Sequence, residues 1–292
     1  INGSTGTIAS ANTFSGSGVQ VAQWNNEYMM IIDPNNGLFS WDGTHLIEIG
    51  SIGVVAISNG GSAYNVSPSV VISAPNNANG IQANATSFLT TGGNSVSFIA
   101  LTNAGTGYNT TPTVTITSAN GVGSGATAVA SLLNFKTGTV TINVITGGAG
   151  YTSAPTVNIS GGGGTNAAGT AIVLGNIVTQ VVMTNFGSGY TNSANLVVSL
   201  SGGGFTNAAT ITATINNTTN TAIATFSGRL WIAQGRTIYY SAAGSYSDFT
   251  SVSAGFLISC IFLVMIQSTY SQMFVYSQMV QRYLPILTFL PQ

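Results

Sequence analysis

Few side chains in this sequence could carry out proton transfer or nucleophilic chemistry. The single histidine, His45, lies close in sequence to Asp42 and Glu48, and this is the one place where acid–base catalysis is conceivable. A serine nucleophile would need a distant serine near His45, and no Gly-x-Ser-x-Gly elbow stands between a strand and a helix. Histidines in turns such as Asp42-Gly-Thr-His45 are ordinarily solvated. We therefore predict no catalytic residue here.

The acidic residues offer two further possibilities, a pair of hydrolytic carboxylates and a calcium loop. A glycosidase pair would have to come from Glu27, Asp33, Asp42, Glu48 and Asp248, with Glu27 and Asp248 as one conceivable cleft. The segment Asp33-Pro-Asn-Asn-Gly37 partly resembles a calcium loop, but it lacks the alternating ligand spacing and the closing glutamate. A simple turn is the better interpretation, and we predict no metal site.

Glycine and cysteine add no stronger signal for a cofactor. The run Gly161–Gly164 is followed by no Gly-Lys-Ser/Thr, so it predicts a flexible turn rather than a phosphate loop. One cysteine, Cys260, cannot form an internal disulfide, and one histidine cannot build a histidine-based metal cage. We therefore expect no bound cofactor and no enzymatic activity.

Charge is scarce and unevenly placed. The 292 residues are 3% charged, against about 25% in an ordinary soluble domain. From Ile49 to Gly228 the only charged residue is Lys136. The net charge of −1 and the absence of a Lys/Arg cluster exclude a basic nucleic-acid surface. Because net charge near zero favours association, we expect much of the surface to lie against other copies or other proteins.

Four repeats, each aligned on a tyrosine, occupy the middle of the chain. They begin Gly-x-Ala/Gly-Tyr and continue x-x-x-Pro/Ala-x-Val/Leu, with the tyrosines at Tyr64, Tyr108, Tyr151 and Tyr190. Alternating β-branched residues on both sides predict strands, and the glycines predict turns. Each unit of about 40 residues is predicted to be a small three-stranded β module. Four modules would form an elongated array or a pair of compact lobes rather than one closed barrel.

The repeat tyrosines allow two interpretations. Exposed in a row, their rings could stack on sugars. Packed over its own Gly-x-Gly turn, each ring would instead cap a small core. We favour the second interpretation.

The flanks predict a different architecture. Residues 1–50 and 221–255 carry short aromatic-rich strands joined by turns such as Asp33–Gly37 and Asp42-Gly43, typical of propeller blades. Residues 51–220 hold the four repeats, and residues 256–292 form an apolar tail that alternation predicts to contain strands. Phe256–Ile266 is too short for a transmembrane helix, which needs roughly 20 residues, so we expect a buried strand or hairpin there. No signal peptide is visible at the first residue, Ile1. The predicted fold is all-β: blade-like antiparallel flanks with an inserted array of four small β repeats.

The residues quoted above resemble a known family. Phe226-x-x-Arg229-Leu-Trp231 with Thr237-Ile-Tyr-Tyr240, the segment from Trp24 to Ile49, and the Gly-x-Gly-Tyr-x-x-x-Pro-x-Val repeats are similar to parts of tail and connector proteins of short-tailed bacteriophages. The resemblance implies a homo-oligomeric, non-catalytic structural protein of the virion tail or neck, such as a nozzle. Its implied partners are further copies, other virion proteins and, as a further candidate, a host surface glycan. A secreted or cell-surface adhesin or filament subunit, whose repeats form a stalk or a glycan-binding face, is the alternative.

Overall fold

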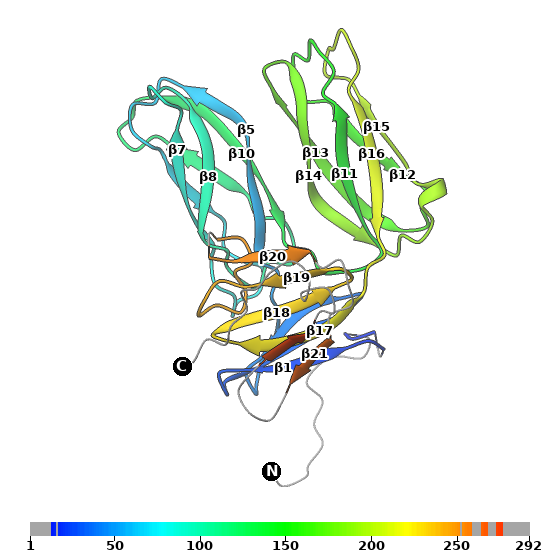
Figure 1. The fold of residues 1–292 in the computed structure, drawn as a ribbon. Coiled ribbons are helices and arrows are strands. Elements are labelled where there is room, and N and C mark those ends of the chain that lie inside the picture. The colour runs from blue at the N-terminus through cyan, green and yellow to red at the C-terminus, as the bar shows by residue number, and fades with distance from the viewer. Residues whose placement is uncertain (1–12, 16, 252, 259–263, 268–272, 277–292) are drawn as a thin grey trace.

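The computed structural model describes residues 13–15, 17–251, 253–258, 264–267 and 273–276. The chain is essentially all-β, as predicted, with several antiparallel sheets and no closed barrel among these residues. Two lobes stand side by side on a base, and the base is formed by strands from both sides of the repeat region, residues 20–48 and 220–258 (Figure 1).

Two four-stranded antiparallel sheets form the base. The first contains β1 (Gln20–Trp24), β2 (Tyr28–Asp33), β3 (Gly37–Trp41) and β4 (Leu46–Glu48). The second contains β17 (Asn220–Phe226), β18 (Arg229–Gln234), β19 (Thr237–Tyr240) and β20 (Gly255–Ile258). In both sheets the strands follow chain order, as in a propeller blade. Strand β20 is the edge strand of the second sheet. Phe256 and Leu257, predicted to begin a buried strand or hairpin, are instead exposed there (59% and 54%), because no further strand of the sheet covers this edge among the described residues.

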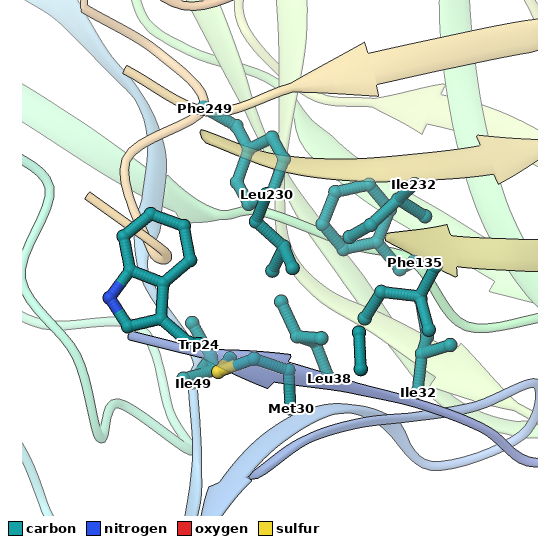
Figure 2. Packing of buried hydrophobic residues seen from close by; sticks show 11 residues of the cluster. Trp24, Met30, Ile32, Leu38, Ile49, Phe135, Leu230, Ile232 and Phe249 are labelled. Atoms are coloured by element: carbon teal, nitrogen blue, oxygen red, sulfur yellow. The ribbon is translucent and has the colours of Figure 1, made fainter. Parts of the chain in front are cut away.

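The base is held together by a core between the facing sheets. Trp24, Met30 and Ile32 of the first sheet meet Leu230 and Ile232 of the second (Figure 2). Their positions follow the alternation of a strand with one buried face. Phe135, from the linker between the lobes, joins the same core and packs edge-on against Phe249.

The lobes are built from the four tyrosine repeats, two repeats in each. The first lobe contains β5 (Ile52–Ser62), β6 (Ser69–Ile72), β7 (Asn84–Leu89), β8 (Val96–Asn103), β9 (Val114–Thr117) and β10 (Ser124–Leu132). The second contains β11 (Thr139–Thr146), β12 (Thr156–Ser160), β13 (Thr165–Leu174), β14 (Ile177–Ser188), β15 (Val197–Ser201) and β16 (Thr210–Asn216), with a short 3-10 turn, η1 (Ser193–Asn195). The pair of lobes is one of the two arrangements that the sequence predicts.

Each repeat does contribute three strands, but it does not form a module by itself. In the first lobe, β5 of one repeat pairs with β10 of the other, β8 pairs with β7, and the middle strands β6 and β9 pair together. In the second lobe the equivalent pairs are β11–β16, β14–β13 and β12–β15. The two lobes thus share three strand pairings, and in the first lobe β6 also pairs with β7. A strand trio from one repeat is too small to bury its apolar face, so two repeats exchange strands to build one core.

The tyrosines fasten the two repeats of a lobe to each other. The hydroxyl of Tyr108, in the second repeat, accepts a hydrogen bond from the Ala83 amide of the first repeat (2.9 Å) and donates one to the Ser73 carbonyl (2.9 Å). Tyr64 in turn accepts from Ala126 of the second repeat (3.3 Å). In the second lobe Tyr151 accepts from Ala209 (2.8 Å).

A glycine permits this close approach. Gly105 has a φ of +69°, and a Cβ there would lie only 2.6 Å from the Ile81 carbonyl oxygen and 2.8 Å from the ring of Tyr108. Any other residue would both strain the backbone and push the tyrosine away from the neighbouring repeat.

The part of the chain after β20 is described only in β21 (Val264–Gln267) and β22 (Met273–Tyr276), which pair as an antiparallel hairpin. Strand β21 contacts β17 of the base. Cys260 and the residues after Tyr276 lie outside the described part, as do residues 1–12. No helix within the described residues is long and apolar enough to cross a membrane.

Candidate functional site: the junction and the uncharged lobe surfaces

The lobes are tied to the base at one three-way junction. Lys136 lies in the linker between the lobes, and its Nζ donates to Oε1 of Glu48, the last residue of β4 in the first base sheet, at 2.6 Å. Both side chains are about one-third exposed. The side-chain amides of Asn216 and Asn220 donate to the carbonyls of Lys136 and Phe135 (2.9 Å each), which fixes the linker backbone. The one charge of the repeat region is thus used to hold the linker on the base.

The lobes also touch each other directly. The hydroxyl of Ser131 in β10 donates to the Met183 carbonyl of β14 at 2.6 Å, and Thr111 donates to the neighbouring Thr184 carbonyl. Ala56 of the first lobe packs with Ile172 and Val182 of the second in a small apolar cluster. These contacts set the angle between the lobes.

A hollow lies on each side of the junction. The smaller, about 150 Å³, lies beside Glu48, Ser51 and Lys136; the buried Ser51 hydroxyl has no hydrogen-bond partner among the described residues. The larger, about 650 Å³, lies between the lobes above the base strand β19. Its lining is neutral, with amide and hydroxyl side chains such as Gln180, Thr214 and Gln234.

The residues considered for acid–base chemistry, Asp42, His45 and Glu48, are engaged in different local interactions. Asp42 accepts hydrogen bonds from the backbone amides of His45 and Thr44 (2.6 and 2.8 Å), and these bonds lower its pKa to about 2. His45 Nδ1 lies 3.2 Å from Asp42 Oδ2 in this exposed turn. Glu48 instead binds Lys136. Asp42 and His45 thus belong to one exposed turn, and Glu48 belongs to the ion pair with Lys136.

Asp33, the first residue of the calcium-like segment, is a buried turn residue. Its carboxylate accepts bonds from the Ser15 amide and hydroxyl (2.6 and 2.8 Å) and from the amides of Asn35 and Asn36 (2.8 and 2.9 Å). Burial alone would raise its pKa, but these hydrogen bonds outweigh burial and hold the pKa below its usual 3.8. Four donors already surround the carboxylate. No group of three or more His, Cys, Asp or Glu side chains close enough to hold a metal occurs within the described residues.

The remaining candidates also have local structural roles. Asp248 accepts from the amides of Thr250 and Ser251 (both 2.9 Å) and stabilises a loop of the base. Gly164, at the end of the glycine run, lies against the ring of Tyr190, and a Cβ there would come within 2.3 Å of it. The glycine run therefore makes room for the fourth repeat tyrosine.

All four repeat tyrosines are buried, with exposures of 1–4%. Their rings lie inside the lobes, so they cannot stack on sugars at the surface. The favoured interpretation of the sequence, a tyrosine that caps a core, is confirmed, with the addition that the core belongs to two repeats.

The lobe surfaces are the feature with the clearest functional meaning. Residues 52–132 and 139–216 contain no charged residue. They nevertheless expose large apolar side chains, among them Val71 (53%), Phe98 (52%) and Ile145 (61%). Phe88 and Phe98 stack face to face at 4.4 Å on neighbouring strands of the first lobe. Sequence reasoning predicts the missing charge but not this pair, because only the bulge between Phe88 and Leu89 aligns the two rings.

Comparisons with known proteins add no relative. No family model, no curated protein and no solved structure matches this chain significantly.

Proposed function

We propose that this chain is a structural, non-catalytic protein of a bacteriophage virion, a homo-oligomeric component of a tail or neck. The observation that carries the proposal is the surface of the lobes: two complete β lobes without one charged side chain and with large apolar groups exposed. A solvated monomer ordinarily keeps itself apart from other copies through net charge and a mixed, charged surface. This surface lacks both.

The architecture supports the same function. The two lobes project separately from the base, so each presents much of its own surface to neighbouring molecules (Figure 1). Surface of this kind suits a protein that contacts several neighbours. The resemblance of the repeats and blades to short-tailed phage proteins supports the virion as the location.

The direct test is the mass of the purified full chain, measured by sedimentation velocity and native mass spectrometry. We expect a defined oligomer that persists in 1 M NaCl, because neutral surfaces associate without ion pairs. A second pair of variants tests the lobe surface: Phe98→Lys should weaken association, whereas Thr102→Lys, a matched charge at an exposed polar position nearby, should weaken it less. A stable monomer at all concentrations would overturn the proposal.

The location in the virion needs its own measurement. Mass spectrometry of purified phage particles should find the chain in fixed stoichiometry, and labelled antibodies should mark the tail or neck in electron micrographs. Antibody binding to bacterial surface filaments instead would favour the adhesin or filament alternative and overturn the virion assignment.

A further inference from the structure

The two sheets of the base are equivalent strand by strand, and this allows a position-by-position comparison. Trp24, the last residue of β1, pairs with the first residue of β2, and Phe226, the last of β17, pairs with the first of β18. Trp24 therefore corresponds to Phe226. Counting along the strands, Met29 corresponds to Leu230.

At two positions the first sheet exposes residues whose counterparts the second sheet buries, whereas Ile31 is buried like its counterpart Ile232. Leu230 and Ile223 are 0% and 8% exposed because they face the first sheet in the base core. Their counterparts Met29 and Val21 are 38% and 58% exposed. This face is here called the outer face of the first sheet. At its centre Ile31 and Phe39 are already buried, with Phe14 packed edge-on against Phe39 (ring centroids 5.4 Å apart), whereas Val21 and Met29 remain uncovered.

The second sheet shows the reverse. Trp24 is 4% exposed because it packs into the base core, whereas its counterpart Phe226 is 36% exposed. Leu257 of β20 lies on the same face as Phe226 and is 54% exposed. The hairpin β21–β22 contacts β17 and leaves these two side chains accessible. The outer face of the first sheet and the outer face of the second sheet thus both expose apolar side chains. Their residues correspond to the two faces that pack together inside the base.

Charge and shape agree with this fit. The outer face of the first sheet contains a hollow of about 490 Å³, lined by Val21, Met29 and Trp41 and bordered by the carboxylates of Glu27 and Asp42. The outer face of the second sheet carries Arg229, whose guanidinium lies 5.5 Å above the ring of Tyr240. The β1–β2 turn, which carries Glu27, and the β17–β18 turn, which precedes Arg229, lie at the same end of the base. The ends of β1 and β17 are neighbours there, since the Thr225 hydroxyl donates to the Gln23 carbonyl.

We propose that copies of this chain associate head to tail through the base: the outer face of the second sheet of one copy packs on the outer face of the first sheet of the next. The contact repeats between chains the packing that Figure 2 shows within one chain. It joins different faces, so it produces a ring where the rotation closes and an open helix where it does not. The inference rests on the proposed homo-oligomeric function and adds a contact through the base to the contacts proposed for the lobe surfaces.

Cysteine cross-linking tests the contact. In a full-length Cys260→Ser background, Met29→Cys and Phe226→Cys are made in separate chains and then mixed under mild oxidation. We expect a disulfide-linked pair in the mixture and none with either chain alone. As a matched control, Val71→Cys on the first lobe, mixed with Phe226→Cys, should give no link. Met29 is exposed, and circular dichroism checks that each variant folds.

A charge substitution supplies an independent measurement. Glu27→Arg brings like charge toward Arg229 of the next copy and should raise the dissociation constant at least about tenfold, whereas Thr102→Arg on the first lobe should leave it near that of the unmodified chain. An oligomer that shows neither the cross-link nor the Glu27 effect would overturn the head-to-tail contact and leave the proposed function standing. A monomer would overturn both.

Discussion

The hydroxyl of Tyr108 should account for much of the stability of the first lobe. It bonds to the Ala83 amide and the Ser73 carbonyl, and Ala83 is 2% exposed. Tyr108→Phe keeps the ring and removes only the oxygen. A buried donor left without a partner costs about 1–3 kcal/mol, and loss of the second bond adds about 0.5–1.5 kcal/mol. We expect the free energy of unfolding of the first lobe to fall by about 3 kcal/mol.

Hydrogen exchange read by mass spectrometry separates the lobes, which a single unfolding curve would average. Peptides from β5–β10 should exchange more than about a hundredfold faster in Tyr108→Phe, since each 1.4 kcal/mol changes an equilibrium tenfold. Peptides from β11–β16 provide the internal reference and should change little. Tyr64→Phe is the matched variant: the Tyr64 hydroxyl accepts from the Ala126 amide over a longer distance, 3.3 Å, so a loss of about 1 kcal/mol is expected.

Three results would refute this reasoning. Unchanged exchange rates of β5–β10 in Tyr108→Phe would mean that water replaces the lost hydroxyl with no loss of stability. A larger effect for Tyr64→Phe than for Tyr108→Phe would break the link between hydrogen-bond number and stability. Equal loss of protection in both lobes would mean that the lobes do not unfold separately.

Three further substitutions test other parts of the structure. Ala63 has a φ of +61° where the other repeats have glycine, so Ala63→Gly should raise the urea midpoint of the first lobe by the equivalent of about 0.5–1 kcal/mol, while Ala128→Gly inside β10 should lower it. The pKa of Asp33 lies below 3.8, so its stabilisation is complete above that unfolded value and is lost as the pH falls through the lower folded value; thermal unfolding between pH 2 and 6 should show this acid loss in the native chain and less of it in Asp33→Asn. The ion pair of Lys136 is partly solvated, so Lys136→Met should cost less than about 1 kcal/mol and remove part of the salt dependence of unfolding.

Local pattern was sufficient to predict the strands and turns. Alternating residues such as Thr139–Thr146 become a strand, and Asp42-Gly43 forms the turn between β3 and β4. The burial of the tyrosines could also be predicted, because a ring next to a Gly-x-Gly turn has a cavity to fill. These inferences hold because each depends on residues close together in sequence.

Partner strands could not be predicted in the same way. The pattern of one repeat is equally compatible with pairing inside the repeat and with exchange, since both bury the same face of β5 and β10. Burial is likewise ambiguous at Met29: its position in the alternation predicts the outer face, but its exposure depends on whether another blade lies there. The ion pair between Glu48 and Lys136 spans 88 residues and has no local signal.

The exchange of strands explains why the repeats form two lobes. A single repeat of the first lobe, in which β6 pairs with β7, would leave its first strand β5 without a partner, and the exposed backbone groups of β5 would favour pairing with another chain. The second repeat supplies β10 as the partner of β5 and β8 as a further partner of β7. Four repeats close into two such units with no strand left over, whereas three would leave one repeat unpaired. The structural unit of this architecture is therefore the pair of repeats. An even number of repeats leaves no repeat without a partner, which matters because the lobes carry no charge that would discourage aggregation.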